Sequence, residues 1–149
     1  MTQGTRGVWR FQLGPWPVTV HWSFWLIIVM LGIGFREMWL LPFWALAGFL
    51  GILLHELGHA IAFRRYGSES RILLYAFGGL TFGDRTPRDR SWVVSLAGPA
   101  ITLAAGVPVW LYLNSLSPIT RASSPVYQVL NLWVFVTVFY AFFNLLPIL

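Results

Sequence analysis

Two histidines and a glutamate form the pattern His-Glu-x-x-His within an apolar stretch of the chain. His55 and His59 are four residues apart, so on an α-helix both imidazoles lie on one face, about one turn apart. That spacing lets two ring nitrogens bind one zinc ion, with Glu56 beside them to take a proton from a metal-bound water. Ionisable side chains in apolar helices are costly and rare. The cluster therefore predicts a metal site rather than a group of helix-end polar residues.

The composition indicates a membrane protein. Of the 149 residues, 57% are hydrophobic and only 10% are charged, against roughly 25% charged in soluble domains. A soluble fold of this size could not bury that much apolar surface. There is no cysteine, which excludes disulfides and thiolate ligands, and the net charge of +5 comes from arginines alone. These arginines flank apolar segments, which favours lipid head groups over nucleic acid as their partner.

We predict an all-α polytopic membrane protein with about four transmembrane helices, formed by a single membrane-embedded domain over residues 1–149. A short polar lead-in over residues 1–16 precedes apolar spans at about 18–35, 40–63, 92–113 and 126–146. Between the second and third spans, two short apolar runs flank Gly78 and Gly79, which predicts a re-entrant β-hairpin. Its open edge could pair with an extended substrate. An interfacial loop with no substrate role is the alternative.

The arginines also predict the orientation of the chain. Two precede the first span and six lie between the second and third, while Arg36 and Arg121 lie on the opposite side. By the positive-inside rule, both termini and the hairpin face the cytoplasm. The metal motif then lies toward the cytoplasmic side, and we expect a bacterial or archaeal cell membrane.

Five motifs along the chain resemble those of the site-2 protease family of intramembrane zinc metalloproteases. The resemblance covers nearly the whole chain. The motifs are the zinc motif at His55–Ala60, the glycine hairpin at Phe77-Gly78-Gly79, the Ala-Gly-Pro helix at Ala97-Gly98-Pro99, the start of an Asn-Leu-Leu-Pro element at Phe143–Pro147, and a first-helix His-x-Ser-Phe at His21–Phe24.

The resemblance implies a zinc-dependent endopeptidase that cuts transmembrane segments of single-pass, membrane-tethered proteins. It implies Zn²⁺ held by His55 and His59, with Glu56 as general base and then general acid. It also implies a substrate-binding role for Phe77, Gly78, Gly79 and Asn144. His21 is implied as a residue beside the site, although its position alone favours a histidine at head-group level.

Two positions depart from the family pattern. Thr102 stands where the family commonly has asparagine, and threonine can still form a hydrogen bond. The family's third zinc ligand is an aspartate a few residues beyond Asn-Leu-Leu-Pro, whereas this sequence stops at Leu149. We therefore expect a domain that is incomplete at its C-terminal end, since catalytic zinc usually has three protein ligands.

Two other functions stay open. The first is a non-catalytic module that holds a transmembrane partner without cutting it, because the third ligand is absent from the sequence. The second is a channel or transporter in which the histidine motif is accidental. The protease predicts zinc and cleavage, the module predicts capture without product, and the channel predicts neither zinc nor an effect of His55→Ala.

Overall fold

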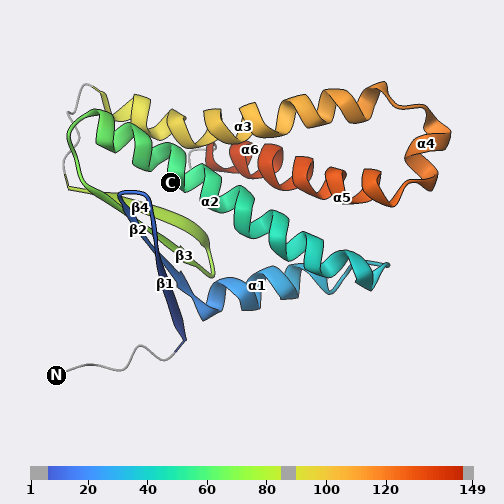
Figure 1. The fold of residues 1–149 in the computed structure, drawn as a ribbon, viewed down its shortest axis with the longest axis horizontal. Coiled ribbons are helices and arrows are strands. Elements are labelled where there is room, and N and C mark those ends of the chain that lie inside the picture. The colour runs from blue at the N-terminus through green and yellow to red at the C-terminus, as the bar shows by residue number, and fades with distance from the viewer. Residues whose placement is uncertain (1–6, 85–89, 146–149) are drawn as a thin grey trace.

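The computed structural model describes residues 7–84 and 90–145. Most of its elements are helices, and four short strands form one small sheet (Figure 1). The helices are α1 (Trp22–Gly32), η1 (Met38–Leu40), α2 (Leu41–Arg65), α3 (Ser91–Ser115), α4 (Pro118–Ser123), α5 (Pro125–Val134), the π-helix η3 (Phe135–Phe139) and α6 (Tyr140–Leu145). The strands are β1 (Val8–Leu13), β2 (Trp16–His21), β3 (Ser70–Tyr75) and β4 (Gly78–Gly83).

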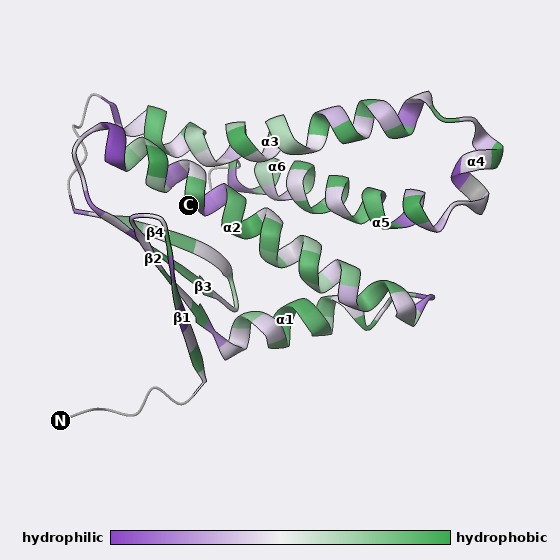
Figure 2. Ribbon diagram, viewed as in Figure 1, coloured by the Kyte–Doolittle hydropathy of each residue, from purple (hydrophilic) through white to green (hydrophobic). Residues whose placement is uncertain are grey.

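Three helical segments are long and apolar enough to cross a membrane. They cover Met38–Arg65, Ser91–Ser115 and Pro125–Leu145, and hydrophobic residues run along the length of each (Figure 2). They agree closely with the predicted second, third and fourth spans. The chain is a membrane protein, since a helix of about 20 apolar residues is what a bilayer core requires.

The first predicted span is not one long helix. Its beginning belongs to strand β2, and α1 starts only at Trp22 and has 11 residues. Val18 and Val20 are each 1% exposed and flank the half-buried Thr19. This period of two, in β-branched residues, is that of a half-buried strand. Hydropathy alone does not separate such a strand from a buried helix, which is why the sequence analysis merged the two.

The predicted hairpin is present as β3 and β4, but it is half of a larger sheet. The strands lie in the order β1-β2-β3-β4. The β1–β2 and β3–β4 pairs are antiparallel, while β2 and β3 are parallel, with Val18 opposite Ile72 and Val20 opposite Leu74. The lead-in that we expected to be merely polar thus contains β1 and supplies the sheet with an N-terminal hairpin.

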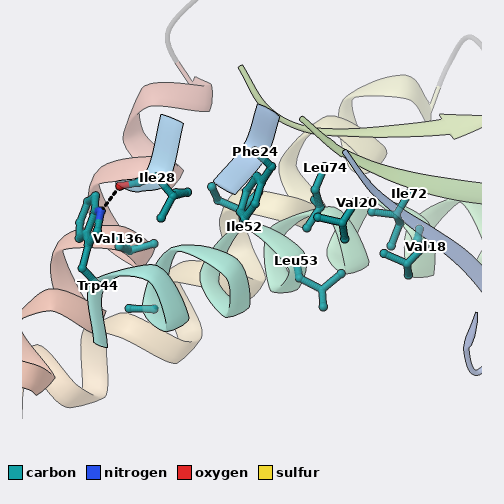
Figure 3. Packing of buried hydrophobic residues seen from close by; sticks show 12 residues of the cluster. Val18, Val20, Phe24, Ile28, Trp44, Ile52, Leu53, Ile72, Leu74 and Val136 are labelled. Carbon is teal, nitrogen blue, oxygen red and sulfur yellow. Dashed lines mark hydrogen bonds between the residues drawn. The ribbon is translucent and has the colours of Figure 1, made fainter. Parts of the chain in front are cut away.

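Helix α2 lies between two groups of elements (Figure 1). On one side, the buried valines of β2 and the buried residues of β3 pack against it together with α1 (Figure 3). The indole Nε1 of Trp44 donates to the carbonyl oxygen of Ile28 at 2.8 Å, which joins α2 to α1. On the other side α2 contacts α3 and the segment α5–η3–α6. A side chain in the middle of α2 is therefore enclosed by the sheet and by both later spans.

Candidate metal centre

The two histidines of α2 lie together and face α3. Their ring centroids are 4.8 Å apart, and His55 is 0% exposed. The Nδ1 atom of His59 donates to the carbonyl oxygen of Val94 on α3 at 2.7 Å. Because a carbonyl can only accept, this bond puts the proton on Nδ1 and leaves Nε2 of His59 with a free lone pair. Both ring nitrogens of His55 are buried and have no hydrogen-bond partner among the described residues.

The Nε2 atoms of both histidines converge on Gly98 of α3. A Cβ atom added to Gly98 would lie less than 3.0 Å from Nε2 of His55 and from Nε2 of His59. Thr102, the position that departs from the family pattern, is fully buried, and its hydroxyl donates to the carbonyl oxygens of Gly98 and Pro99, each at 3.1 Å. The missing side chain at position 98 thus leaves a space that the Nε2 atoms of both histidines border.

This arrangement fits a zinc ion. Zinc is commonly bound by neutral histidine nitrogens, and a ligating histidine usually donates its other N–H to a carbonyl or carboxylate, as His59 does. The unpartnered nitrogens of His55 would otherwise be a buried, unsatisfied polar group, which is costly. Within residues 7–84 and 90–145, no group of three or more His, Cys, Asp or Glu side chains is placed to hold a metal. The described part of the site could therefore supply two ligands, His55 and His59.

Glu56 lies against strand β4. Its side chain is 3% exposed, and the hydroxyl of Thr81 donates to its Oε2 at 2.8 Å and lies 3.0 Å from its backbone carbonyl oxygen. A Cβ atom added to Gly79 would lie less than 3.0 Å from the carboxylate carbon and Oε1 of Glu56. Only a residue without a side chain lets the strand approach the carboxylate this closely. The structure thus brings the zinc motif and the glycine hairpin together.

The turn between β3 and β4 carries the other predicted substrate-binding residues. Phe77 is 89% exposed at the tip of the turn, with its ring 5.8 Å from that of Tyr75. Gly78 pairs with Tyr75 at the start of β4. The turn also borders an apolar cavity of about 700 Å³, whose walls come from α1, α2, α5, η3 and α6.

His21 and Asn144 are the two remaining predicted residues, and each is linked to this region by hydrogen bonds through an intermediate residue. His21 caps the N-terminus of α1, with its Nδ1 2.7 Å from the hydroxyl of Ser23, and that hydroxyl accepts a hydrogen bond from the backbone N–H of Ala76 in the turn. The Asn144 side chain is exposed and donates to the carbonyl oxygen of Tyr140 at 2.8 Å. The roles predicted for His21 and Asn144 stay predictions.

Tyr140 is a residue of the site that the sequence analysis missed. Its ring meets His55 edge-on, with centroids 4.9 Å apart, and its hydroxyl accepts a hydrogen bond from the backbone N–H of Gly79 at 3.1 Å. The one signal in the sequence was its four-residue spacing from Asn144, which places both on one side of a helix. Thr81 was missed as well, since nothing local shows that its strand faces Glu56.

The comparisons with known proteins point to one kind of enzyme. The chain is 30% identical over 141 residues to a zinc metalloprotease of Methanocaldococcus jannaschii. Its fold matches the solved structure of a site-2 protease from the same organism with a TM-score of 0.68 and 25% sequence identity, over 94% of this chain. The chain spans 40% of the length of the first protein and 65% of the second. No protein-family model matches it.

Proposed function

We propose that this chain acts as a zinc-dependent intramembrane endopeptidase, on the premise that it belongs to the site-2 protease family, an assignment that these two matches support. The proposed substrates are transmembrane segments of single-pass, membrane-tethered proteins. One observation carries the proposal. The Nε2 atoms of the buried His55 and the partly buried His59 border one space beside Gly98, and the residue that follows His55 is a buried glutamate. These residues match two of the three zinc ligands and the general base of a zinc hydrolase.

His55 and His59 would hold the zinc through Nε2. When bound, zinc would polarise the scissile carbonyl and make the attacking water more acidic. Glu56 would accept a proton from that water at its carboxylate and donate it to the leaving amine. The hydrogen bond from Thr81 would hold one carboxylate oxygen in place, so that the other stays free to move the proton.

The proposed substrate is unwound before it is cut. A helical segment has its carbonyls in hydrogen bonds, so the scissile peptide must be locally extended. Strand β4 is the last strand of the sheet and contacts Glu56 through Gly79. A substrate strand added at the free edge of β4 would be held in extended form. The apolar cavity beside the turn would receive the apolar side chains of a transmembrane segment.

The orientation of the protein in its membrane is also a proposal. The arginines Arg64 and Arg65 end α2, and His55 lies ten residues before Arg65, about 15 Å along the helix. With the arginine-rich side in the cytoplasm, the site would lie within the membrane on its cytoplasmic side. A bacterial or archaeal cell membrane remains the proposed location.

Removing the metal tests the proposed function. We expect the protein purified from its own membrane to cut a single-pass substrate in lipid nanodiscs, with fragments identified by mass spectrometry. A chelator should lower the cleavage rate at least about 100-fold, and added zinc should restore it. Substrate with zinc alone is the control. Cleavage that resists chelation would overturn the proposal, while substrate capture without product at saturating zinc would support the non-catalytic module.

Replacing Thr81 tests how Glu56 is held. Thr81→Val keeps the shape of the side chain but removes the hydroxyl that donates to Glu56. We expect kcat to fall about fivefold with the zinc content unchanged, because one net hydrogen bond is worth about 1 kcal/mol. Thr81→Ser, which keeps the hydroxyl, should retain most of the activity. Normal activity in Thr81→Val together with a loss in Thr81→Ser would mean that the methyl group, not the hydroxyl, matters at this position.

A further inference from the structure

The β3–β4 turn is held on two sides by helices from distant parts of the chain. The hydroxyl of Ser23 on α1 accepts from the N–H of Ala76 at 3.2 Å, and the hydroxyl of Tyr140 on α6 accepts from the N–H of Gly79 at 3.1 Å. Because Gly79 lies directly against the carboxylate of Glu56, the distance between β4 and Glu56 depends on where these two bonds hold the turn.

His55 lacks the support that His59 has. The ring of His59 is oriented by its hydrogen bond to Val94, whereas neither nitrogen of the His55 ring has a hydrogen-bond partner within residues 7–84 and 90–145. In this part of the chain, packing sets the orientation of the His55 ring. Two aromatic rings meet it edge-on, that of His59 at 4.8 Å and that of Tyr140 at 4.9 Å. Tyr140 is thus a neighbour from outside α2 that contacts both His55 and the turn.

The π-helix η3 determines where Tyr140 points. It immediately precedes Tyr140, and its extra residue per turn shifts the direction of every side chain that follows. The segment is packed closely on both sides. A Cβ atom added to Gly51 of α2 would lie 2.6 Å from a methyl group of Val136, and one added to Gly106 of α3 would contact the hydroxyl of Thr137. A segment that is packed closely against α2 and α3 can position a side chain precisely.

We propose that Tyr140 is a positioning residue of the site, which acts through two separate groups. Its hydroxyl holds the β3–β4 turn against Glu56, and its ring holds His55 in the orientation that lets Nε2 face Gly98. This inference rests on the proposed function as far as catalysis is concerned. The two roles are separable, because Tyr140→Phe removes only the hydroxyl, while Tyr140→Leu removes the hydroxyl and the ring.

The hydroxyl role is tested by hydrogen exchange and kinetics together. Tyr140→Phe leaves the Gly79 amide without its acceptor, so we expect exchange in the 76–80 segment to accelerate about fivefold, with the rest of the sheet unchanged. Ser23→Ala, which removes the other bond, should act on the same segment. In the cleavage assay, Tyr140→Phe should raise KM about fivefold and change kcat less than about twofold. Tyr127→Phe on α5 is the matched control.

The ring role is tested by zinc affinity, measured by competition with a chelating dye. Tyr140→Phe should bind zinc as tightly as the unmodified protein, whereas Tyr140→Leu should bind it at least about tenfold more weakly, as is usual when the support of a ligand is removed. Recovery of zinc affinity in the phenylalanine variant, relative to leucine, is a result that general destabilisation would not give.

Two results would overturn the proposal. One is unchanged exchange in the 76–80 segment of Tyr140→Phe, and the other is equal zinc affinity in Tyr140→Leu and the unmodified protein. Exchange and zinc binding are both measured without substrate, so they decide the role of Tyr140 even if the protein cuts no peptide. Failure of the protease proposal would instead appear as absence of zinc-dependent product in the unmodified protein.

Discussion

Gly98→Ala is expected to abolish zinc binding and cleavage while leaving the chain folded in the membrane. The added methyl group would lie less than 3.0 Å from the Nε2 atoms of both His55 and His59, which are the proposed ligand atoms. Removing outer support of a ligand typically costs 10- to 100-fold in metal affinity, so blocking the ligand atoms should cost at least about 100-fold. Metal content, measured by mass spectrometry on the purified protein, checks the prediction.

Gly34→Ala is the matched control for this variant. It makes the same chemical change at a glycine whose added Cβ atom would meet no atom of the described residues within 4 Å, so zinc content and cleavage should stay unchanged. Alanine also has the higher helix propensity, by about 1 kcal/mol. Loss of the α3 helix would therefore not explain an inactive Gly98→Ala variant. Normal zinc content in that variant would show that the ligand atoms are not the two Nε2 atoms.

Glu56→Gln is expected to lower cleavage about 1000-fold while zinc and substrate still bind. Glutamine has the shape of glutamate and can still accept the hydrogen bond from Thr81 at its amide oxygen. It cannot take up a proton from water, and general acid–base catalysis typically contributes 10²- to 10⁴-fold to a rate. Single-turnover cleavage, with zinc content and substrate binding measured on the same sample, checks all three parts.

Glu69→Gln provides the comparison for Glu56→Gln. Glu69 is exposed in the loop that follows α2, and we expect its replacement to change neither zinc content nor cleavage. Retention of more than about a tenth of the activity in Glu56→Gln would mean that another group moves the proton. Loss of zinc in the same variant would instead assign Glu56 a role in holding the metal.

The zinc motif could be predicted because its geometry is local. The four-residue spacing of His55 and His59 fixes their common face on any helix, and the run of apolar residues around them predicts that helix. Glu56 follows from the same pattern. The contacts that complete the surroundings are not local, because Val94, Gly98 and Tyr140 come from later spans. The periodicity of the sequence does not predict which carbonyl or ring will face a histidine in another helix.

The sheet shows the same limit, because local residues predict its turn but not the pairing of its strands. The glycine pair predicted the β3–β4 turn, since turn chemistry is also local. The pairing of β2 with β3 joins Val18 to Ile72, two residues far apart in the chain. Before that partner is known, an apolar run that begins with Val18 can be part of a helix as well as of a strand. The partner decides the secondary structure, so hydropathy predicted a helix where there is a strand.

The two bonds that hold the β3–β4 turn also set the order in which the site can be assembled. Helix α2 carries the complete histidine motif, and the bond from Ala76 to Ser23 uses residues that are synthesised early. The bond from Gly79 reaches 61 positions ahead, to a residue of α6. It can form only after the ribosome has made α3, α4 and α5 and the last described span has inserted. A nascent chain therefore holds the His-Glu-x-x-His motif well before its β3–β4 turn is fixed, because the second bond to the turn waits for α6.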